Sequence, residues 1–469
     1  MNALANQFSG LIEASPFTLA LVPNLIATAL AMPLVAFVVL AASAAFGAKL
    51  AERTTAWLIH LCFGTAAAAA MLASVLGALL AAGPISLHLP PLFRFGGESF
   101  ALDFRLDLVS TPFFVLTALL SGVIGAFSHR YLHREPGGRR FFMLLALFAF
   151  GMQLIVLSTG VDLLFVGWEL VGVTSALLIA FFHERASPVR HGFWAFGFYR
   201  ACDVGLLSAA VMLHHHGGSG MLVGYVPSVA EAGLLGALLV FASMAKSAQF
   251  PFGSWLPRAM EGPTPSSAIF YGALSLHAGS YLLLRTASLW QPSPWVPWLI
   301  VAIGGVTALH GTVVGRVQSD IKSTLAYAAM TQSGLIFVEI GLGLHGLALL
   351  HVVGHSFLRT LQLLRAPSLM HDHHRLEQAI GSHLPRTGLH YERWLPVGLQ
   401  NRLYRHALHR WHLDTLILHV VGARVRALVG GLDWLDRRLA GILGAAELAE
   451  PTHTPNPSNE PDPAQTRPV

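Results

Sequence analysis

The fold class of this chain is decided by residues 141–182, which read FFMLLALFAFGMQLIVLSTGVDLLFVGWELVGVTSALLIAFF. Asp162 and Glu169 are the only Asp, Glu, Lys or Arg residues in this stretch. A helix needs about 20 apolar residues to cross the hydrocarbon core of a bilayer, so the stretch can hold two consecutive membrane spans. The sequence therefore predicts membrane-spanning helices on either side of residues 158–160.

The whole chain has the composition of an all-α polytopic membrane protein. Of its 469 residues, 54% are hydrophobic and 11% are charged, whereas about 25% of the residues in a soluble domain are charged. So few charges cannot cover a water-facing surface. The composition excludes a secreted disulfide scaffold, a nucleic-acid-binding domain and most soluble enzymes. Cys62 and Cys202 lie inside apolar runs, and the chain contains no Walker A, HExxH or CxxC motif.

Eleven apolar runs are long enough to span the membrane. They are Phe17–Phe46, Ala56–Ala82, Leu108–Phe127, Phe141–Leu157, Val161–Phe182, Phe193–Leu213, Leu234–Phe250, Pro265–Leu289, Trp298–Val317, Ile321–Gly341 and Leu344–Leu364. The first run is too long for the core of a signal peptide and follows no Lys or Arg, so we expect an uncleaved helix.

Loop charges predict the orientation of these spans. One set of alternate loops carries eleven Lys or Arg residues, whereas the other carries Arg94 and Arg105. Because cytoplasmic loops are enriched in Lys and Arg, we expect the first set to face the cytoplasm. The N-terminus would then be periplasmic, and the C-terminus cytoplasmic.

Ionisable residues inside predicted spans are the strongest functional signals, because charge in hydrocarbon is costly. Glu169 lies in the middle of the fifth span, and Lys246 lies in the seventh. Pro251 follows Lys246 by five residues and predicts a broken seventh helix, whose freed carbonyl groups would favour water and a cation. A purely structural role is hardest to accept for Glu169 and Lys246, since each is costly alone.

Three further groups of ionisable residues leave a structural interpretation open. Arg200 and Asp203 stand at i, i+3 in the sixth span and could be a structural pair. A second group shares one face of the eleventh span at i, i+4, i+8, and its histidines could merely join helices. That group is His351, His355 and Arg359. Asp320 and Lys322 open the tenth span and could anchor it at the interface. The His214–His216 run and His371, His373 and His374 lack partners for a metal site, so we predict none.

Several motifs together resemble the proton-translocating antiporter-like subunits of respiratory complex I and Mrp antiporters. They are VGWELVG, KSAQFPFGSWLPRAMEGPTPSSA, SDIKSTLAYAAMTQSG and HVVGHSFLRTLQLL, between about Leu106 and Arg365. Within that family the chain is most similar to DabB-type membrane subunits of inorganic carbon pumps. It has Tyr271 where complex I subunits typically carry a histidine, with His277 six residues later, and Arg359 replaces their usual lysine. The resemblance implies an antiporter-like fold with a truncated second repeat.

The resemblance also implies roles for individual residues. Lys246 would exchange a proton while Glu169 tunes its affinity, and His351 and His355 would be relay histidines. An arginine does not release its proton near neutral pH, so Arg359 could tune the local field but could not pass protons.

The implied partner is a DabA-like soluble zinc protein that resembles a β-carbonic anhydrase, and together they would form a heterodimeric pump in the inner membrane. The zinc would belong to the partner, and this chain would need no cofactor. Sequence leaves open whether H⁺ or Na⁺ is the coupling ion and whether CO₂ or bicarbonate is handled. A proton-pumping subunit of a complex I-like or hydrogenase-type oxidoreductase, an Mrp-type antiporter subunit and an inert membrane scaffold are the alternatives.

We expect four parts along the chain. Residues 1–105 would hold the first helices and a periplasmic loop, and residues 106–365 the ion-translocating core. Residues 366–449 include an Arg-rich region without an evident spanning run, in which leucines recur at helical spacing, and would form amphipathic cytoplasmic helices that dock the partner. Residues 450–469 contain six prolines and would be a disordered tail.

Overall fold

The computed structural model describes residues 16–48, 50–80, 83–95, 98–217, 220–222, 224–380 and 394–442. The chain divides into two units, Met1–His409 and Arg410–Val469. The predicted boundary at residue 365 falls inside a continuous helix, α15 (His345–Ile380). The predicted tail, 450–469, lies outside the described residues.

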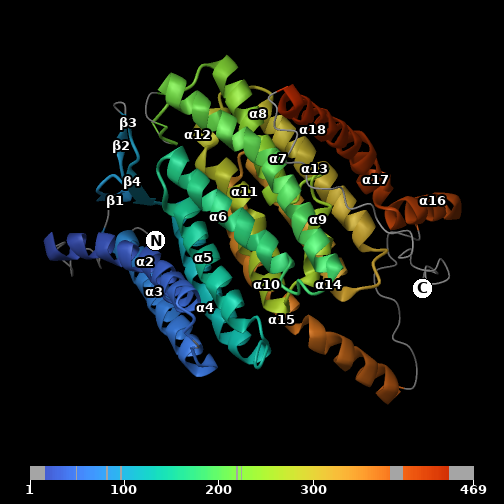
Figure 1. Ribbon diagram of the computed structural model, residues 1–469, viewed down its shortest axis with the longest axis horizontal. Helices are drawn as coiled ribbons and strands as arrows, with labels where there is room; N and C mark the ends of the chain where they lie inside the picture. Colours follow the sequence, from blue (N-terminus) through green and yellow to red (C-terminus); the bar gives the residue numbers. More distant parts are fainter. Residues whose placement is uncertain are drawn as a thin grey trace. The chain divides into compact units, whose positions relative to one another are not determined.

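The first unit is a bundle of long helices (Figure 1). Besides α15, they are α2 (Pro16–Ala45), α3 (Glu52–Leu80), α4 (Ser110–Tyr131), α5 (Gly138–Leu157), α6 (Val161–Ile179), α7 (Ala186–Gly217), α8 (Val229–Lys246), α13 (Val296–Gly315), α14 (Ile321–Gly341) and α16 (Val397–Leu408). Shorter elements lie between α8 and α13: α9 (Trp255–Arg258), η1 (Ala259–Glu261), α10 (Thr264–Ser266), the π-helical turn η2 (Ser267–Tyr271), α11 (Leu274–Arg285) and α12 (Ala287–Trp290).

The fold confirms a polytopic, predominantly helical membrane protein with a broken seventh span. Eleven helices in the described part are long and apolar enough to cross a membrane, and ten of them coincide with predicted spans. The predicted tenth span forms α14. Its polar residues, among them Gln332 and Glu339, make this helix less apolar than the eleven candidate spans, so it is not one of them. Arg410–Gly441 belongs to the eleven instead, contrary to our expectation that no run in that region is long enough to span.

Polar helices occupy the interior of the bundle. All residues in the most apolar stretch of the Thr264–Arg285 span are buried. In the corresponding stretches of α2 and α3 only about one third of the residues are buried. Because lipid tails solvate apolar surface, a span that carries polar residues such as Ser275 and His277 is stable only when other helices cover it. The eighth span is thereby placed in the core.

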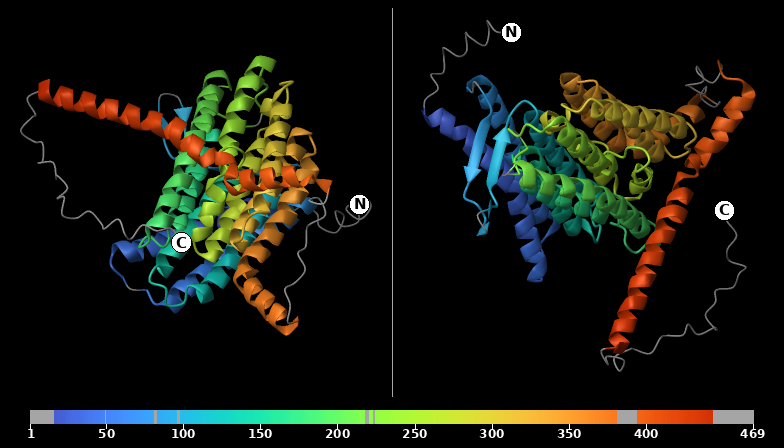
Figure 2. Two further views of the ribbon diagram at one scale, coloured as in Figure 1. Left: turned by 90° about the vertical axis from the view of Figure 1, so that its right-hand side faces the viewer. Right: turned by 90° about the horizontal axis from the view of Figure 1, so that it is seen from above.

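Small residues hold α14 against α13, which lies beside it (Figures 1 and 2). A Cβ added at Gly304 of α13 would lie 2.5 Å from the carbonyl oxygen of Gly334, and one added at Gly334 would lie 2.6 Å from that of Gly304. Such close backbone approach is typical of helix pairs in membranes. It explains how the comparatively polar α14 is retained in the bundle.

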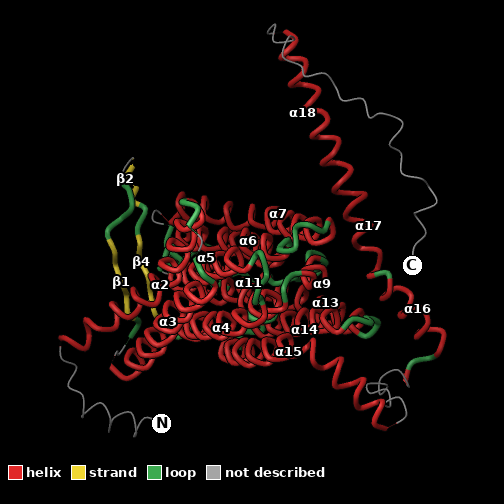
Figure 3. Tube along the Cα trace, turned by 60° about the horizontal axis from the view of Figure 1, so that its bottom comes forward, coloured by secondary structure: helices red, strands yellow, loops and turns green. Residues whose placement is uncertain are grey.

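Two short strand pairs interrupt the helices between α3 and α4, a feature absent from the predicted element list. β1 (Ile85–Leu89) pairs antiparallel with β4 (Leu102–Leu106), and β2 (Arg94–Phe95) with β3 (Glu98–Ser99). The strands are yellow in Figure 3, and β1 lies beside α2. Their alternating residues are too few to produce a sequence signal as strong as that of the helices.

An ion pair ties the segment after β4 to α11. Arg285 donates from Nη1 to Asp107 Oδ2 at 2.6 Å and from Nε to Tyr281 Oη at 2.9 Å. Tyr281 in turn donates to the carbonyl oxygen of Val156 at 2.6 Å. Because the Arg285 side chain is only 4% exposed, Asp107 supplies the countercharge without which its burial would be costly.

We expect Asp107→Asn to destabilise the protein at pH 7 by about 3 kcal/mol, since it leaves the Arg285 charge buried and unpaired. Burial alone would raise the pKa of Asp107, but Arg285 and nearby backbone N–H groups hold that pKa below its usual value. The stabilisation is therefore present above the unfolded-state pKa of about 4 and is lost as pH falls through the folded-state pKa. Thermal unfolding in detergent across acidic and neutral pH measures it. An equal loss at every pH would contradict this linkage.

The second unit is helical throughout its described residues. Its elements are η4 (Arg410–His412), α17 (Leu413–Ile417), η5 (Leu418–Gly422) and α18 (Ala423–Ile442). The side chains of Leu428, Leu432, Leu435 and Leu439 are exposed. Such a run suits a bilayer, a membrane surface or a partner protein.

Topology can be tested with single cysteines and a membrane-impermeant maleimide applied to intact cells. Loop charges predict that Val226→Cys is labelled and Glu135→Cys is protected. If 410–441 lies on the cytoplasmic surface, Asn401→Cys and Gly441→Cys are both protected. The wild-type chain, whose two cysteines are buried, is the control. Labelling of Gly441→Cys but not Asn401→Cys would show that 410–441 crosses the membrane.

Candidate functional site

The break after α8 places Lys246 at the end of a helix inside the bundle. α8 ends at Lys246, and Ala248 has a φ of +50°, which a right-handed helix cannot contain. Pro251 lies in the turn that follows, where its missing N–H costs no helical hydrogen bond. The broken seventh helix is therefore confirmed, with its break starting before the proline.

Side chains satisfy backbone groups at this break. The carbonyl oxygen of Ser247 accepts from Gln249 Nε2 at 2.9 Å and from Ser333 Oγ at 3.0 Å. Trp255 Nε1 donates to the carbonyl oxygen of Ala245 at 2.9 Å. The expectation that these carbonyls would be free for a cation is wrong for Ala245 and Ser247, because neighbouring side chains already occupy them.

Lys246 is fully buried among aromatic rings. Its Nζ donates to the carbonyl oxygen of Trp168 at 2.9 Å. It also lies 4.5 Å from the centroid of the Tyr199 ring and 5.2 Å from that of Trp168. Aromatic faces attract a cation without carrying a charge that would neutralise it. The ammonium group is thus held by one carbonyl oxygen and two aromatic ring faces.

Three charged side chains from α6 and α7 form a cluster beside Lys246. Arg200 donates from Nη1 to Glu169 Oε2 and from Nη2 to Asp203 Oδ2, the second bond measuring 2.6 Å. Asp203 Oδ1 also accepts from the indole Nε1 of Trp168 at 2.5 Å. Arg200 therefore bridges two carboxylates, of which Asp203 is the more deeply buried.

Glu169 and Lys246 are close enough to interact electrostatically but form no ion pair within 4.0 Å. Trp168 instead links the lysine to Asp203, because its carbonyl accepts from Lys246 and its indole donates to Asp203. Glu169, which the resemblance implies tunes the proton affinity of Lys246, is therefore connected to the lysine through Arg200, Asp203 and Trp168. Arg200 and Asp203, which sequence left open as a structural pair, are the middle of that connection.

A glycine provides the space for the lysine. A Cβ added at Gly172 of α6 would lie 2.7 Å from Lys246 Nζ and 3.3 Å from Arg200 Nη2. The distance to Nζ is shorter than side-chain carbons tolerate, so a larger residue would displace the ammonium group.

A second cluster joins α11, α14 and α15. The Nε2 of His277 lies 2.9 Å from the Nδ1 of His355, in hydrogen-bond contact. His351 Nδ1 lies 2.8 Å from Glu339 Oε1, and its Nε2 lies 2.9 Å from Gln332 Oε1. The rings of His351 and His355 are 6.4 Å apart between centroids. The predicted histidines therefore converge on one polar track inside the bundle.

The remaining predicted residues have varied settings. Tyr271 lies in η2 and donates to the carbonyl oxygen of Ser175 at 3.0 Å. Asp320 caps α14, since its Oδ2 accepts from the Ser323 N–H at 2.8 Å, and Lys322 follows in the first turn. Arg359 is buried on α15, four residues after His355. The capping bond of Asp320 agrees with its interpretation as a helix anchor.

Sequence reasoning missed several residues of both clusters. Trp168, Tyr199 and Gln332 carry no charge and gave no signal among many similar residues. Glu339 is an ionisable residue inside the tenth span, so the criterion that selected Glu169 could have found it.

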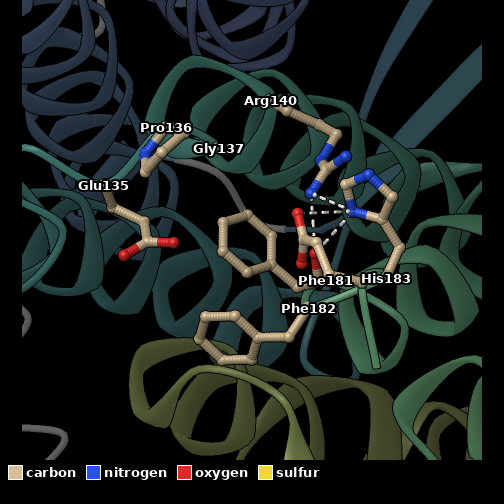
Figure 4. A pocket seen from close by; sticks show the side chains of 8 residues that line it. Glu135, Pro136, Gly137, Arg140, Phe181, Phe182 and His183 are labelled. Carbon is tan, nitrogen blue, oxygen red and sulfur yellow. Dashed lines mark hydrogen bonds and ion pairs between the residues drawn. The ribbon is translucent and has the colours of Figure 1, made fainter. Parts of the chain in front are cut away.

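A cavity of about 320 Å³ lies away from these predicted residues, between the α4–α5 and α6–α7 connections (Figure 4). Arg140 Nη2 donates there to the carbonyl oxygen of Phe181 at 2.6 Å and to His183 Nδ1 at 3.1 Å. The guanidinium carbon also lies 5.0 Å from the centroid of the Phe181 ring. These contacts engage Arg140 in holding the two connections together.

The structure thus places a fully buried lysine at a helix break, beside two carboxylates that share one arginine, and a histidine track on other helices of the bundle. Residues 158–382 match the family described as NADH:quinone oxidoreductase/Mrp antiporter, TM. Residues 93–142 match the family described as NADH-Ubiquinone oxidoreductase (complex I), chain 5 N-terminus. The chain is thus similar to antiporter-like membrane subunits over residues 93–142 and 158–382.

Individual proteins show the same similarity. NADH-ubiquinone oxidoreductase chain 5 of Schizophyllum commune is 36% identical over 275 residues, 57% of this chain and 40% of that protein. NADH-quinone oxidoreductase subunit L of Campylobacter jejuni is 35% identical over 283 residues, 59% of this chain and 47% of that protein. A chain of the Mrp complex from Dietzia sp. aligns with a TM-score of 0.62 and 26% identity, over 73% of this chain and 37% of that chain. This chain thus spans less than half the length of these relatives.

We expect Gly172→Ala to lower ion translocation about 10-fold or more while the protein still inserts and folds, because the added methyl group displaces Lys246 Nζ. Gly197→Ala in α7 is the matched control, since a Cβ there meets no atom within 4 Å. Transport in membrane vesicles, normalised to the amount of protein, measures both variants. Equal activity of the two would show that the space around Lys246 is not limiting.

Proposed function

We propose that this chain translocates protons, or sodium ions, through the cluster around Lys246. The observation that carries this proposal is a fully buried ammonium group that touches a carbonyl and two aromatic rings but no carboxylate. Burial disfavours the charged form of a lysine, whereas nearby carboxylates favour it. The balance between these two effects can be shifted by small movements of charge.

Arg200 supplies a means of shifting that balance. It contacts Glu169, whose side chain is 24% exposed, and Asp203, whose side chain is 5% exposed. Protonation of Glu169 would release Arg200 toward Asp203 and weaken the negative field at Lys246. The lysine would then give up its proton more readily, which links arrival of one proton to departure of another.

The histidine track extends the pathway across the second part of the core. Imidazole can accept a proton on one nitrogen and release one from the other, so His277, His355 and His351 can pass protons in sequence. Arg359, at the end of this track, keeps its proton near neutral pH and acts as a fixed charge. The translocated ion would therefore not pass through residue 359.

Beyond ion translocation, the chain would serve as the membrane subunit of an energy-coupled inorganic carbon pump. Tyr271 and Arg359, which replace a histidine and a lysine usual in complex I subunits, support this specialisation. Its partner would be a cytoplasmic, DabA-like zinc protein resembling β-carbonic anhydrase. That partner would hydrate CO₂ to bicarbonate, with the zinc held by its own residues. Ion flow through this chain would make the conversion one-way.

The alternative is a proton-pumping subunit of a complex I-like or hydrogenase-type oxidoreductase, or of an Mrp-type antiporter. The names of the relatives favour it, because they are subunits of NADH-quinone and NADH-ubiquinone oxidoreductases and of an Mrp complex. Purification through a tag on this chain, with its neighbouring genes co-expressed, distinguishes the two. A bound zinc protein that hydrates CO₂ supports the carbon pump, whereas bound quinone-reducing or Mrp subunits support the alternative.

We expect Lys246→Ala and Glu169→Ala to abolish function, since one removes the titrating group and the other its regulating charge. Lys322→Ala, which changes a cation at the first turn of α14, should retain more activity than Lys246→Ala. The assay is growth in ambient air of a carbonic-anhydrase-deficient host that carries this chain and its partner. Immunoblots of isolated membranes check insertion. Full rescue by both Lys246→Ala and Glu169→Ala would refute the proposed pathway.

A further inference from the structure

Arg359 is a buried charge without a protein countercharge. The residue is 6% exposed, and no described residue forms an ion pair or hydrogen bond with its guanidinium. Its stem packs closely, because a Cβ added at Gly272 would lie 3.2 Å from Arg359 Cγ. A guanidinium stays ionised at any physiological pH, so the side chain cannot escape this cost by losing its proton. An unpaired buried charge of this kind calls for an anion.

The histidine pair beside Arg359 offers further hydrogen-bonding capacity. Contact between His277 Nε2 and His355 Nδ1 leaves His277 Nδ1 and His355 Nε2 buried and without a partner. If His277 donates in this contact, a neutral His355 must carry its own proton on Nε2. His355 then presents an N–H donor one helical turn from Arg359, on the same helix.

The carboxylate of this track does not neutralise the arginine. Glu339 accepts instead from His351, at 2.8 Å between Oε1 and Nδ1. The other nitrogen of His351 faces the side-chain oxygen of Gln332. Among the described residues, the track therefore holds one permanent cation and several imidazoles against one carboxylate, whose Oε1 contacts His351 and whose Oε2 is buried without a hydrogen-bond partner.

We infer that Arg359 and His355 bind a small, planar, monovalent oxyanion inside the membrane core. A guanidinium presents parallel N–H groups that match two oxygens of a carboxylate-like anion, and His355 Nε2–H can supply a third donor. Bicarbonate and formate have this shape, whereas chloride cannot accept two parallel bonds on separate oxygens. The bound anion would supply the missing countercharge and select one tautomer of the histidine pair.

The site is distinct from the Lys246 cluster and goes beyond the proposed ion translocation. The choice of bicarbonate as the physiological anion rests on the proposed carbon-uptake function. Binding can be measured on the chain itself, without transport or a partner. Failure of anion binding and failure of the proposed function are therefore distinguishable.

The test is thermal unfolding of the detergent-solubilised full chain, with bicarbonate, formate or chloride titrated at constant pH and ionic strength. Bicarbonate and formate should raise the unfolding temperature of the wild type with saturation, and chloride should not. Arg359→Gln should raise the half-saturating concentration about 10-fold or more, the loss expected when hydrogen bonds to a charged group are removed. Arg185→Gln is the matched control, because it removes the same charge from a guanidinium that lies over the Phe182 ring.

Arg359→Lys and His355→Gln keep the inference testable if Arg359→Gln does not fold. The lysine variant retains the charge but lacks the parallel N–H groups, so it should bind formate more weakly than the wild type while Arg185→Gln binds normally. Absence of an anion-dependent shift in the wild type would overturn the inference. So would an equal shift with chloride, or unchanged half-saturation in both Arg359→Lys and His355→Gln.

Discussion

The structure depends on satisfying a helix break in a medium that offers no water. After Lys246 the seventh span leaves its helical path, and its backbone groups must find partners on other helices. Gln249 and Ser333 donate to the carbonyl oxygen of Ser247, and Trp255 donates to that of Ala245. The break is therefore a packed and bonded junction that holds the end of α8, and with it the lysine, in one position.

From this junction a chain of contacts leads from the fully buried Lys246 to the more exposed Arg200 and Glu169. Lys246 has only a carbonyl and aromatic rings as direct partners, while the carboxylates that act on it are bound to Arg200. A direct ion pair would hold the lysine permanently charged, since the two opposite charges would stabilise each other in a low dielectric. Trp168 and Arg200 instead contact these groups, so that the carboxylates of Glu169 and Asp203 act on Lys246 without forming an ion pair with it.

The two clusters differ in how their buried charges are paired. Around Lys246 two carboxylates share one arginine, whereas in the described part of the Arg359 cluster the carboxylate of Glu339 contacts His351 and forms no ion pair with the arginine. The first arrangement suits the gain and loss of a cationic proton. The second favours a bound anion, and Arg359 in place of a titratable lysine makes that preference permanent.

The sequence by itself determined the membrane class, ten of the eleven candidate spans, the broken seventh helix and the charged residues Glu169, Arg200, Asp203 and Lys246, because these follow from local composition and from the cost of burying charge. It did not determine that Arg200 contacts Glu169, that Trp168 links Asp203 to Lys246, or that His277 meets His355. Those contacts join residues 31 to 78 positions apart. Only the packing of α6, α7 and α8, and of α11 against α15, decides them, because helical periodicity shows which residues share a face but not which faces meet.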